Sequence, residues 1–217
     1  MTDLSPLWLS LKVTLAAVCL VVPVGLILAA LLAFRRFPGK SLVETLLALP
    51  LVLPPTVVGF GLLLLLGRGS GVGRWLDDSL GVRLLFTWQG AALAAASMAL
   101  PLFVRSAAAA LASVDRDAID AAKLDGARSP AILLKILVPL ARRGIVAGLL
   151  LASARALGEF GATLMVAGSI PGVTQTLPLA LYEAVQSGND AQARWLAGGL
   201  ALAALALVGL TNRLQHE

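Results

Sequence analysis

Cysteine, histidine and charge are all scarce in this sequence. Cys19 and His216 are each the single residue of their kind among 217. This composition excludes disulfide frameworks, cysteine zinc sites and nucleophile pairs of the Ser/His or Cys/His type. Charged residues make up 13% of the chain, whereas a soluble domain carries about 25%. Because so few charges cannot cover a water-soluble globule of this size, an ordinary soluble domain is excluded as well.

Apolar residues are abundant instead: 59% of the chain is hydrophobic, and the mean hydropathy is +0.90. A helix needs about 20 mainly apolar residues to cross a bilayer. Four windows without charge approach or exceed this length, at residues 13–34, 45–67, 84–104 and 195–212. A fifth, at 144–168, contains only Arg155 and Glu159 as charges. We therefore predict an all-α, polytopic membrane protein with about five spans, forming a single domain over residues 1–217.

The distribution of Lys and Arg predicts the orientation. Eleven of them lie in connections on one side of the predicted spans and four on the other, and short loops rich in Lys and Arg face the cytoplasm. The N-terminus is then outside and the C-terminus cytoplasmic. Because the net charge of +5 follows the membrane sides, we expect no nucleic-acid partner. A cleaved signal peptide is the alternative for residues 13–34, but this stretch is long and its positive charges follow it.

Two connections on the outer side differ in character. Residues 68–83 are rich in glycine and carry Asp77 and Asp78, which predicts a flexible connection. Residues 169–190 contain Pro171, Gly172 and Pro178. We expect an outer loop there, with a short helix at 177–186 on the membrane face.

The motifs of common enzymes and nucleotide-binding proteins are not met. Gly39-Lys40-Ser41 resembles the end of a phosphate-binding loop, but that loop needs a glycine where this chain has Phe34. We therefore expect no catalytic residue, no metal site and no ATP bound by this route. Gly144 and Gly148 form a G-x-x-x-G pair, which allows helices to approach closely. Tight packing within the chain is favoured over dimerisation through this pair.

A connection of some thirty residues, 111–143, is predicted on the cytoplasmic side and is longer than a helix bundle requires. Residues 120–126 are typical of a short helix that ends at Gly126. Ser129 is predicted to cap a second helix with Pro130 at its first position. An apolar stripe follows, made of Ile132, Leu133, Ile136 and Leu137.

This connection resembles the cytoplasmic loop of permease subunits in binding-protein-dependent ABC importers. That loop carries Glu-Ala-Ala, three residues, Gly, nine residues, and Ile-x-Leu-Pro. The matching residues here are Asp120, Ala121, Ala122, Gly126, Ile136, Leu137, Val138 and Pro139. Asp120 replaces Glu and Val138 replaces Leu. The resemblance implies a coupling loop at about 113–142, with ATPase contacts at Asp120, Ala121, Ala122, Gly126, Ile136 and Pro139. An amphipathic hairpin lying on the membrane is the alternative.

Residues 49–59, 154–164 and 168–179 are similar to molybdate permeases, with sulfate permeases as close relatives. This resemblance implies a type I ABC importer permease fold in a bacterial inner membrane. It also implies four kinds of partner: two ATPase subunits, a second copy of the chain, a periplasmic or lipid-anchored oxyanion-binding protein, and membrane lipid. ATP and Mg would be bound by the ATPase, so no cofactor is expected in this chain. Sulfate, thiosulfate and tungstate remain alternative substrates.

Two apolar windows carry features that plain membrane anchors lack. Pro50, Pro54 and Pro55 each remove a backbone donor, and irregular backbone at membrane depth is tolerated where protein or a water-filled cavity surrounds it. Arg155 and Glu159 are four residues apart, close enough to pair on one helical face. We favour structural pairing or stabilisation of a gate over direct contact with substrate.

A path for a tetrahedral dianion must bind it weakly enough to release it, which favours a mostly neutral lining. The residues predicted to line this path or its gate are Pro54, Pro55, Thr56, Gly158, Glu159, Gly161 and Thr163. Two other classes of function are also considered. A channel or secondary transporter leaves the long cytoplasmic loop unexplained and would be expected to show an internal repeat, and an intramembrane enzyme lacks a catalytic constellation.

Overall fold

The computed structural model describes residues 4–124 and 126–216, and every regular element in these ranges is a helix. The predicted all-α fold is confirmed. Within these ranges, three helices are long and apolar enough to cross a membrane. They are α1 (Ser5–Phe34), α5 (Trp88–Ala112) and α12 (Asp190–His216). The first begins earlier than the apolar window at 13–34, so Lys12 lies inside it.

The core lies where α1 and α5 pack against each other and against α9 (Arg142–Leu157). Small side chains dominate this contact, with Ala17, Ala95 and Ala99 fully enclosed. A Cβ added at Gly144 would lie 2.5 Å from the Ala110 Cβ, so α9 and α5 are in close contact there. Small residues let helix backbones approach in this way. The packing role predicted for the G-x-x-x-G pair is therefore confirmed.

Two expected spans are broken. The prolines of the window at 45–67 predicted irregular backbone there, whereas no break was predicted in the window at 144–168. The first of these windows divides into α2 (Lys40–Val52) and α3 (Pro55–Leu66), which meet at an angle of 115°. The second window divides into α9 and α10 (Gly161–Ala167). A further bend of 83° separates Ser129–Leu140 from α9. Counting each bent pair as one span gives up to five spans, in agreement with the predicted number.

The outer connection at 68–83 is not simply flexible, because it contains α4 (Gly71–Leu80). The Ser70 Oγ accepts a hydrogen bond from the Gly73 amide at 2.8 Å and so caps the first turn. Asp77 pairs with Arg83, at 3.0 Å, and with Arg68. The guanidinium groups of Arg83, which has the larger effect, and Arg68 lower the pKa of the Asp77 carboxyl below its ordinary value of 3.8. The glycine-rich composition had predicted a flexible connection, but local hydrogen bonds and ion pairs stabilise a helix there.

The predicted short helix of the second outer connection is present as α11 (Leu177–Gln186). Its first amide, at Leu177, donates a hydrogen bond of 2.7 Å to the Ser10 Oγ of α1. This bond ties the loop to the outer end of the core. The C-terminal helix α12 packs against α9 and α11.

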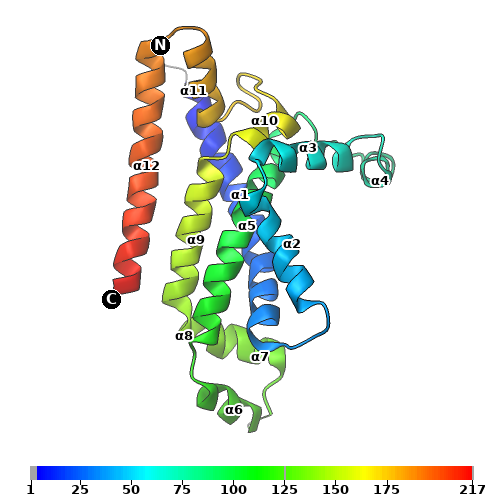
Figure 1. Cartoon of the computed structure of the whole chain (residues 1–217), viewed down its shortest axis with the longest axis vertical. Coiled ribbons are helices and arrows are strands. Elements are labelled where there is room, and N and C mark those ends of the chain that lie inside the picture. The colour runs from blue at the N-terminus through cyan, green and yellow to red at the C-terminus, as the bar shows by residue number, and fades with distance from the viewer. Residues whose placement is uncertain (1–3, 125, 217) are drawn as a thin grey trace.

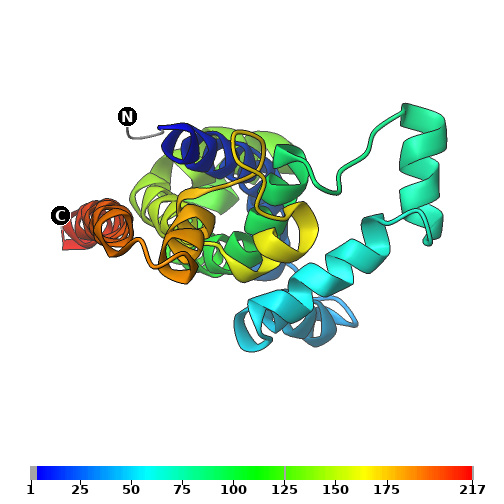
Figure 2. The same ribbon diagram turned by 90° about the horizontal axis from the view of Figure 1, so that it is seen from above.

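The two ends of the molecule carry different elements (Figure 1). The start of α1 and α11 lie at one end, and α6 (Arg116–Leu124), α7 (Ser129–Ile132), α8 (Val138–Leu140) and the end of α12 lie toward the other. Seen from above, α3 and α4 extend away from the packed helices (Figure 2). The chain therefore has a packed body and a projecting arm, which we define as α2, α3 and α4.

Candidate functional site

The first break lies at Leu53 and Pro54. Pro54 is the residue before α3, and Pro55 occupies the first turn of that helix, where a missing amide costs little. Neither proline can continue the hydrogen-bond ladder of α2, so the chain turns sharply there. As a result α3 runs across the direction of the long helices instead of along it (Figure 1).

The second break lies at Gly158, Glu159 and Phe160, between α9 and α10. One carboxylate oxygen of Glu159, Oε1, accepts a hydrogen bond of 2.8 Å from the Ala162 amide in the first turn of α10. The other, Oε2, lies 2.7 Å from Nη1 of Arg155 on α9, within ion-pair distance but outside hydrogen-bond geometry. The Glu159 side chain is 1% exposed and that of Arg155 is 27% exposed. Glu159 therefore joins two helices, whereas the sequence had suggested only a pair on one helix.

The two breaks meet in space. A Cβ added at Gly161 would lie 3.1 Å from the Pro55 Cβ and 3.2 Å from the Thr56 amide nitrogen. One turn further along α3, a Cβ added at Gly59 would lie 2.7 Å from the Cα of Ala162. Glycine is thus required at Gly59 for α3 to contact the backbone of α10. We call this contact the joint, formed by Pro55, Thr56, Gly59, Gly161 and Ala162.

The structure brings together most of the residues predicted for the path. Some of them are exposed and others are buried. Pro54, Thr56 and Gly158 are exposed, whereas Glu159, Gly161 and Thr163 are buried. Thr163 is 1% exposed, so its side chain is buried within the chain in this conformation. Gly59, by contrast, was not among the predicted site residues. In the sequence, Gly59 is only a glycine within an apolar helix. Its importance becomes clear only once the backbone that faces it is known.

The coupling loop contains two helical segments, as predicted, but their bounds differ. The first is α6 (Arg116–Leu124), which begins earlier than expected. Gly126 follows with φ of +77°, and the Ala127 amide bonds back to the Ala122 carbonyl at 3.0 Å. This 6→1 bond, with glycine in the left-handed region, is the Schellman arrangement that ends helices. Asp125 itself lies outside the described residues.

The second segment runs through α7, the π-helical turn η1 (Leu133–Leu137) and α8. Ser129 is its first helical residue, so the predicted cap is wrong; Arg128 holds the cap position, with no side-chain cap bond in the described structure. The widened turn precedes Pro139, which has no amide to continue an α-helical ladder. The predicted apolar stripe packs inward, with Ile132 and Leu137 buried.

The predicted coupling residues divide by exposure. Asp120, Ala121, Gly126 and Pro139 are exposed, Ile136 is partly buried and Ala122 is buried. Two leucines that the sequence did not single out are also prominent at this end, Leu124 at 88% and Leu134 at 63% exposure. Large apolar side chains in such positions are typical of a surface that a partner covers.

These features define a class of protein. It is a polytopic helical membrane protein in which two broken spans contact each other at their breaks and a helical loop is exposed at one end. Comparison with known proteins identifies the family. Residues 21–213 match the family of inner membrane components of binding-protein-dependent transport systems, and the chain belongs to it. The predicted family is confirmed.

Individual relatives agree with this assignment. The chain is 45% identical to the molybdenum transport system permease protein ModB of Escherichia coli K12, over 92% of this chain and 88% of that protein. It is 40% identical to the ModB protein of Haemophilus influenzae, over 85% of this chain and 81% of that protein. It is 34% identical to the sulfate transport system permease protein CysW of Escherichia coli K12, over 98% of this chain and 72% of that protein. The chain is thus a permease-type membrane component, as predicted.

Proposed function

We propose that this chain is the membrane subunit through which an ATP-driven importer carries molybdate into the cell. The ModB proteins of Escherichia coli K12 and Haemophilus influenzae are more similar to it, at 45% and 40% identity, than the sulfate permease of Escherichia coli K12, at 34%. The two groups overlap at lower identity, since another ModB protein is 35% and another sulfate permease 37% identical. Within the chain, the observation that carries the proposal is the joint. Irregular backbone at membrane depth is tolerated where it lines a cavity or is buried in protein, and here two such breaks are in contact.

A second copy of the chain would complete the path. In the described structure α2 buries none of its residues and α3 buries only Gly59. Pro54, next to the joint, and Thr56, within it, are both exposed. Two arms facing each other would enclose these residues, so the path would run between two copies and the joints would form its gate.

Movement would reach the gate through one continuous series of elements. Two ATPase subunits, which bind ATP and Mg, would contact the loop containing Leu124, Gly126 and Leu134. Closure of the ATPases would shift α7 and α8, which connect to α9 through the 83° bend. At its other end α9 carries Arg155, which holds Glu159 and with it the start of α10. A rigid shift of α9 would thus change the contact between α10 and α3.

The charges at the gate suit a doubly negative substrate. Arg155 and the first turn of α10 compensate the Glu159 carboxylate, since helix N-termini favour negative charge. The path then presents no strong cationic site, so the anion is released after entry. In this arrangement the loop end is cytoplasmic, the N-terminus lies outside, and an external binding protein, periplasmic or lipid-anchored, supplies selectivity.

Uptake of labelled oxyanions tests the proposal. Vesicles carrying this chain, its ATPase and its binding protein should accumulate molybdate when ATP is supplied, with tungstate competing almost equally and sulfate or thiosulfate weakly. The matched control contains an ATPase subunit that binds ATP without hydrolysing it, and it should show no accumulation. Sulfate uptake that outcompetes molybdate would contradict the substrate. Uptake without ATP would instead indicate a channel or secondary transporter.

A further inference from the structure

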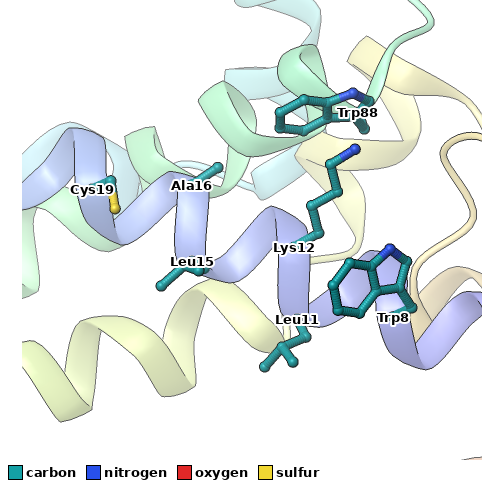
Figure 3. A pocket seen from close by; sticks show the side chains of 7 residues that line it. All are labelled: Trp8, Leu11, Lys12, Leu15, Ala16, Cys19 and Trp88. Atoms are coloured by element: carbon teal, nitrogen blue, oxygen red, sulfur yellow. The ribbon is translucent and has the colours of Figure 1, made fainter.

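A groove of about 310 Å³ runs along the surface of α1 beside the first turn of α5. Its lining is almost entirely apolar, and its one charged side chain, Lys12, lies between Trp8 and Leu15 along α1 (Figure 3). The residues that line it are Trp8, Leu11, Lys12, Leu15, Ala16, Cys19 and Trp88. None of them belongs to the joint or to the coupling loop, so the proposed transport function leaves this groove unexplained.

The cation of the groove, Lys12, lies over an aromatic ring. The Lys12 Nζ lies 3.8 Å from the centre of the Trp88 ring, and Trp8 stands one turn before Lys12 on the same helix, 64% exposed. Figure 3 shows the Lys12 side chain extended toward Trp88. No acidic side chain pairs with Lys12 within the described part of the chain. The ammonium thus keeps hydrogen-bond donors for an anion.

The depth of Lys12 matches the boundary between lipid headgroups and hydrocarbon. The 30 residues of α1 extend about 45 Å at 1.5 Å per residue, and the hydrocarbon core is about 30 Å thick. Both ends of α1 therefore reach the interfaces or tilt toward them, and Lys12 lies about 10 Å from the start of the helix. Tryptophan is enriched at this level, and lysine extends its ammonium toward it. Leu15, Ala16 and Cys19 continue the groove deeper into the bilayer.

We infer that this groove binds one anionic phospholipid. Its phosphate meets the Lys12 ammonium and an indole N–H, and one acyl chain lies along Leu15, Ala16 and Cys19. Lys12 occupies a face of Trp88 and repels a second cation, which disfavours a zwitterionic headgroup with a quaternary ammonium. Trp8 and Lys12 precede the family match at residues 21–213, whereas Trp88 lies within it.

Tryptophan quenching by brominated lipids tests this site directly. The chain has four tryptophans, and replacing Trp75 and Trp195 by Phe leaves Trp8 and Trp88, both in the groove. The full-length chain in nanodiscs would be compared with brominated phosphatidylglycerol and brominated phosphatidylcholine of identical acyl chains. One lysine near a membrane surface favours an anionic lipid about fivefold. We expect this preference in the quenching of the groove tryptophans.

The control variants separate charge from folding. Lys12→Gln should abolish the preference and Lys12→Arg should keep it, whereas Lys135→Gln, a matched substitution in the distant coupling loop, should leave it unchanged. Equal quenching by both lipids in the parent, or a preference that survives Lys12→Gln, overturns the inference. Weak quenching by both lipids would mean that a second copy or another protein covers the groove, and this result also overturns it.

Discussion

The body and the arm of this chain are both apolar, yet they are packed very differently. In the body, α1 and α5 bury many of their residues against each other and α9. In the arm, only Gly59 and Gly73 are buried among the described residues of α2, α3 and α4. Two leucines of α3 are exposed, Leu64 by 57% and Leu65 by 48%, whereas Leu62 and Leu66 are partly buried against the body.

This difference shows that side-chain size, and not hydropathy, separates the two regions. Lipid tails are as apolar as leucine, so a leucine gains little by leaving them, whereas alanine and glycine allow backbones to pack closely. The body is built from such residues; a Cβ added at Gly25, for example, would collide with the Phe103 ring. Apart from the joint, the arm has larger side chains facing outward. Its surface therefore suits lipid or a second copy of the chain.

The largest expected effect is at the charge pair behind the joint. Arg155→Gln leaves the Glu159 carboxylate, 1% exposed, with only its bond to the Ala162 amide. Breaking such a buried pair costs about 3–5 kcal/mol. Glu159→Gln should cost less, because Arg155 is 27% exposed and the new amide oxygen can still accept from Ala162. Thermal unfolding in detergent measures both.

A double-mutant cycle completes this test. Replacing both residues by Gln should recover much of the stability that Arg155→Gln loses, since no uncompensated charge remains. If the two losses simply add, the residues are not coupled and the joint is held by packing alone. The position of α10 relative to α9 would then not depend on this ion pair.

A single substitution made in both regions sharpens the comparison further. Gly148→Val places a side chain at a position where the Cβ alone would lie 2.7 Å from the Ser106 Cβ in the body, and overpacking of this kind costs about 1–3 kcal/mol. Gly61→Val is the matched change in the arm, where no described atom lies within 4 Å of the added Cβ. We expect it to change stability by less than about 0.5 kcal/mol.

The oligomeric state of these two variants shows whether a second copy covers the arm. Unfolding of both variants would be followed in detergent and compared with their size on gel filtration. A loss of stability in Gly61→Val that matches Gly148→Val would mean that the arm is packed against something in the native particle. Dissociation of a dimer by Gly61→Val alone would locate that contact on α3.

Much of the fold followed from sequence periodicity and composition. The apolar windows predicted the membrane location and the number of spans, because the cost of burying polar backbone in lipid leaves few alternatives. The prolines predicted irregular backbone in the window at 45–67, but the break at Gly158 in the window at 144–168 was not predicted. Hydropathy averages over such positions, whereas hydrogen bonding depends on each one. The α4 helix was missed for a related reason: its ion pairs join residues that are six and nine positions apart.

The site was predictable only in part. The sequence spacing suggested that Arg155 and Glu159 meet, and the structure has them 2.7 Å apart. The second contact of Glu159, with α10, depends on a break whose geometry is not local. Gly59 matters because of the facing Ala162, more than one hundred positions along the chain, and a single sequence carries no sign of that contact. The roles of the path and coupling residues in transport stay predictions.

A smaller effect on stability is expected at Gly126, in the exposed loop of the body. Its φ of +77° is left-handed, and no described atom lies within 4 Å of an added Cβ. Any penalty is therefore conformational, about 1–2 kcal/mol for Gly126→Val and less for Gly126→Asn, which tolerates this region. We expect Val to reduce uptake and crosslinking of the loop to the ATPase while the subunit still inserts. Unchanged uptake and crosslinking would contradict the coupling role.

The smallest effect concerns α4, where ion pairs stabilise a helix that has little packing of its own. Because Arg83 and Arg68 lower the pKa of Asp77 below 3.8 in the folded chain, their stabilisation is present above pH 3.8 and is lost as the pH falls through the folded value. Hydrogen exchange should show α4 protection that is constant near neutrality, falls in that acidic range and weakens in high salt. Asp77→Asn should lower this protection already at pH 7. Asp78→Asn is the control, because Asp78 makes no ion pair within the described residues; equal losses in both variants would mean that net charge, and not the pairs, stabilises the end of the arm.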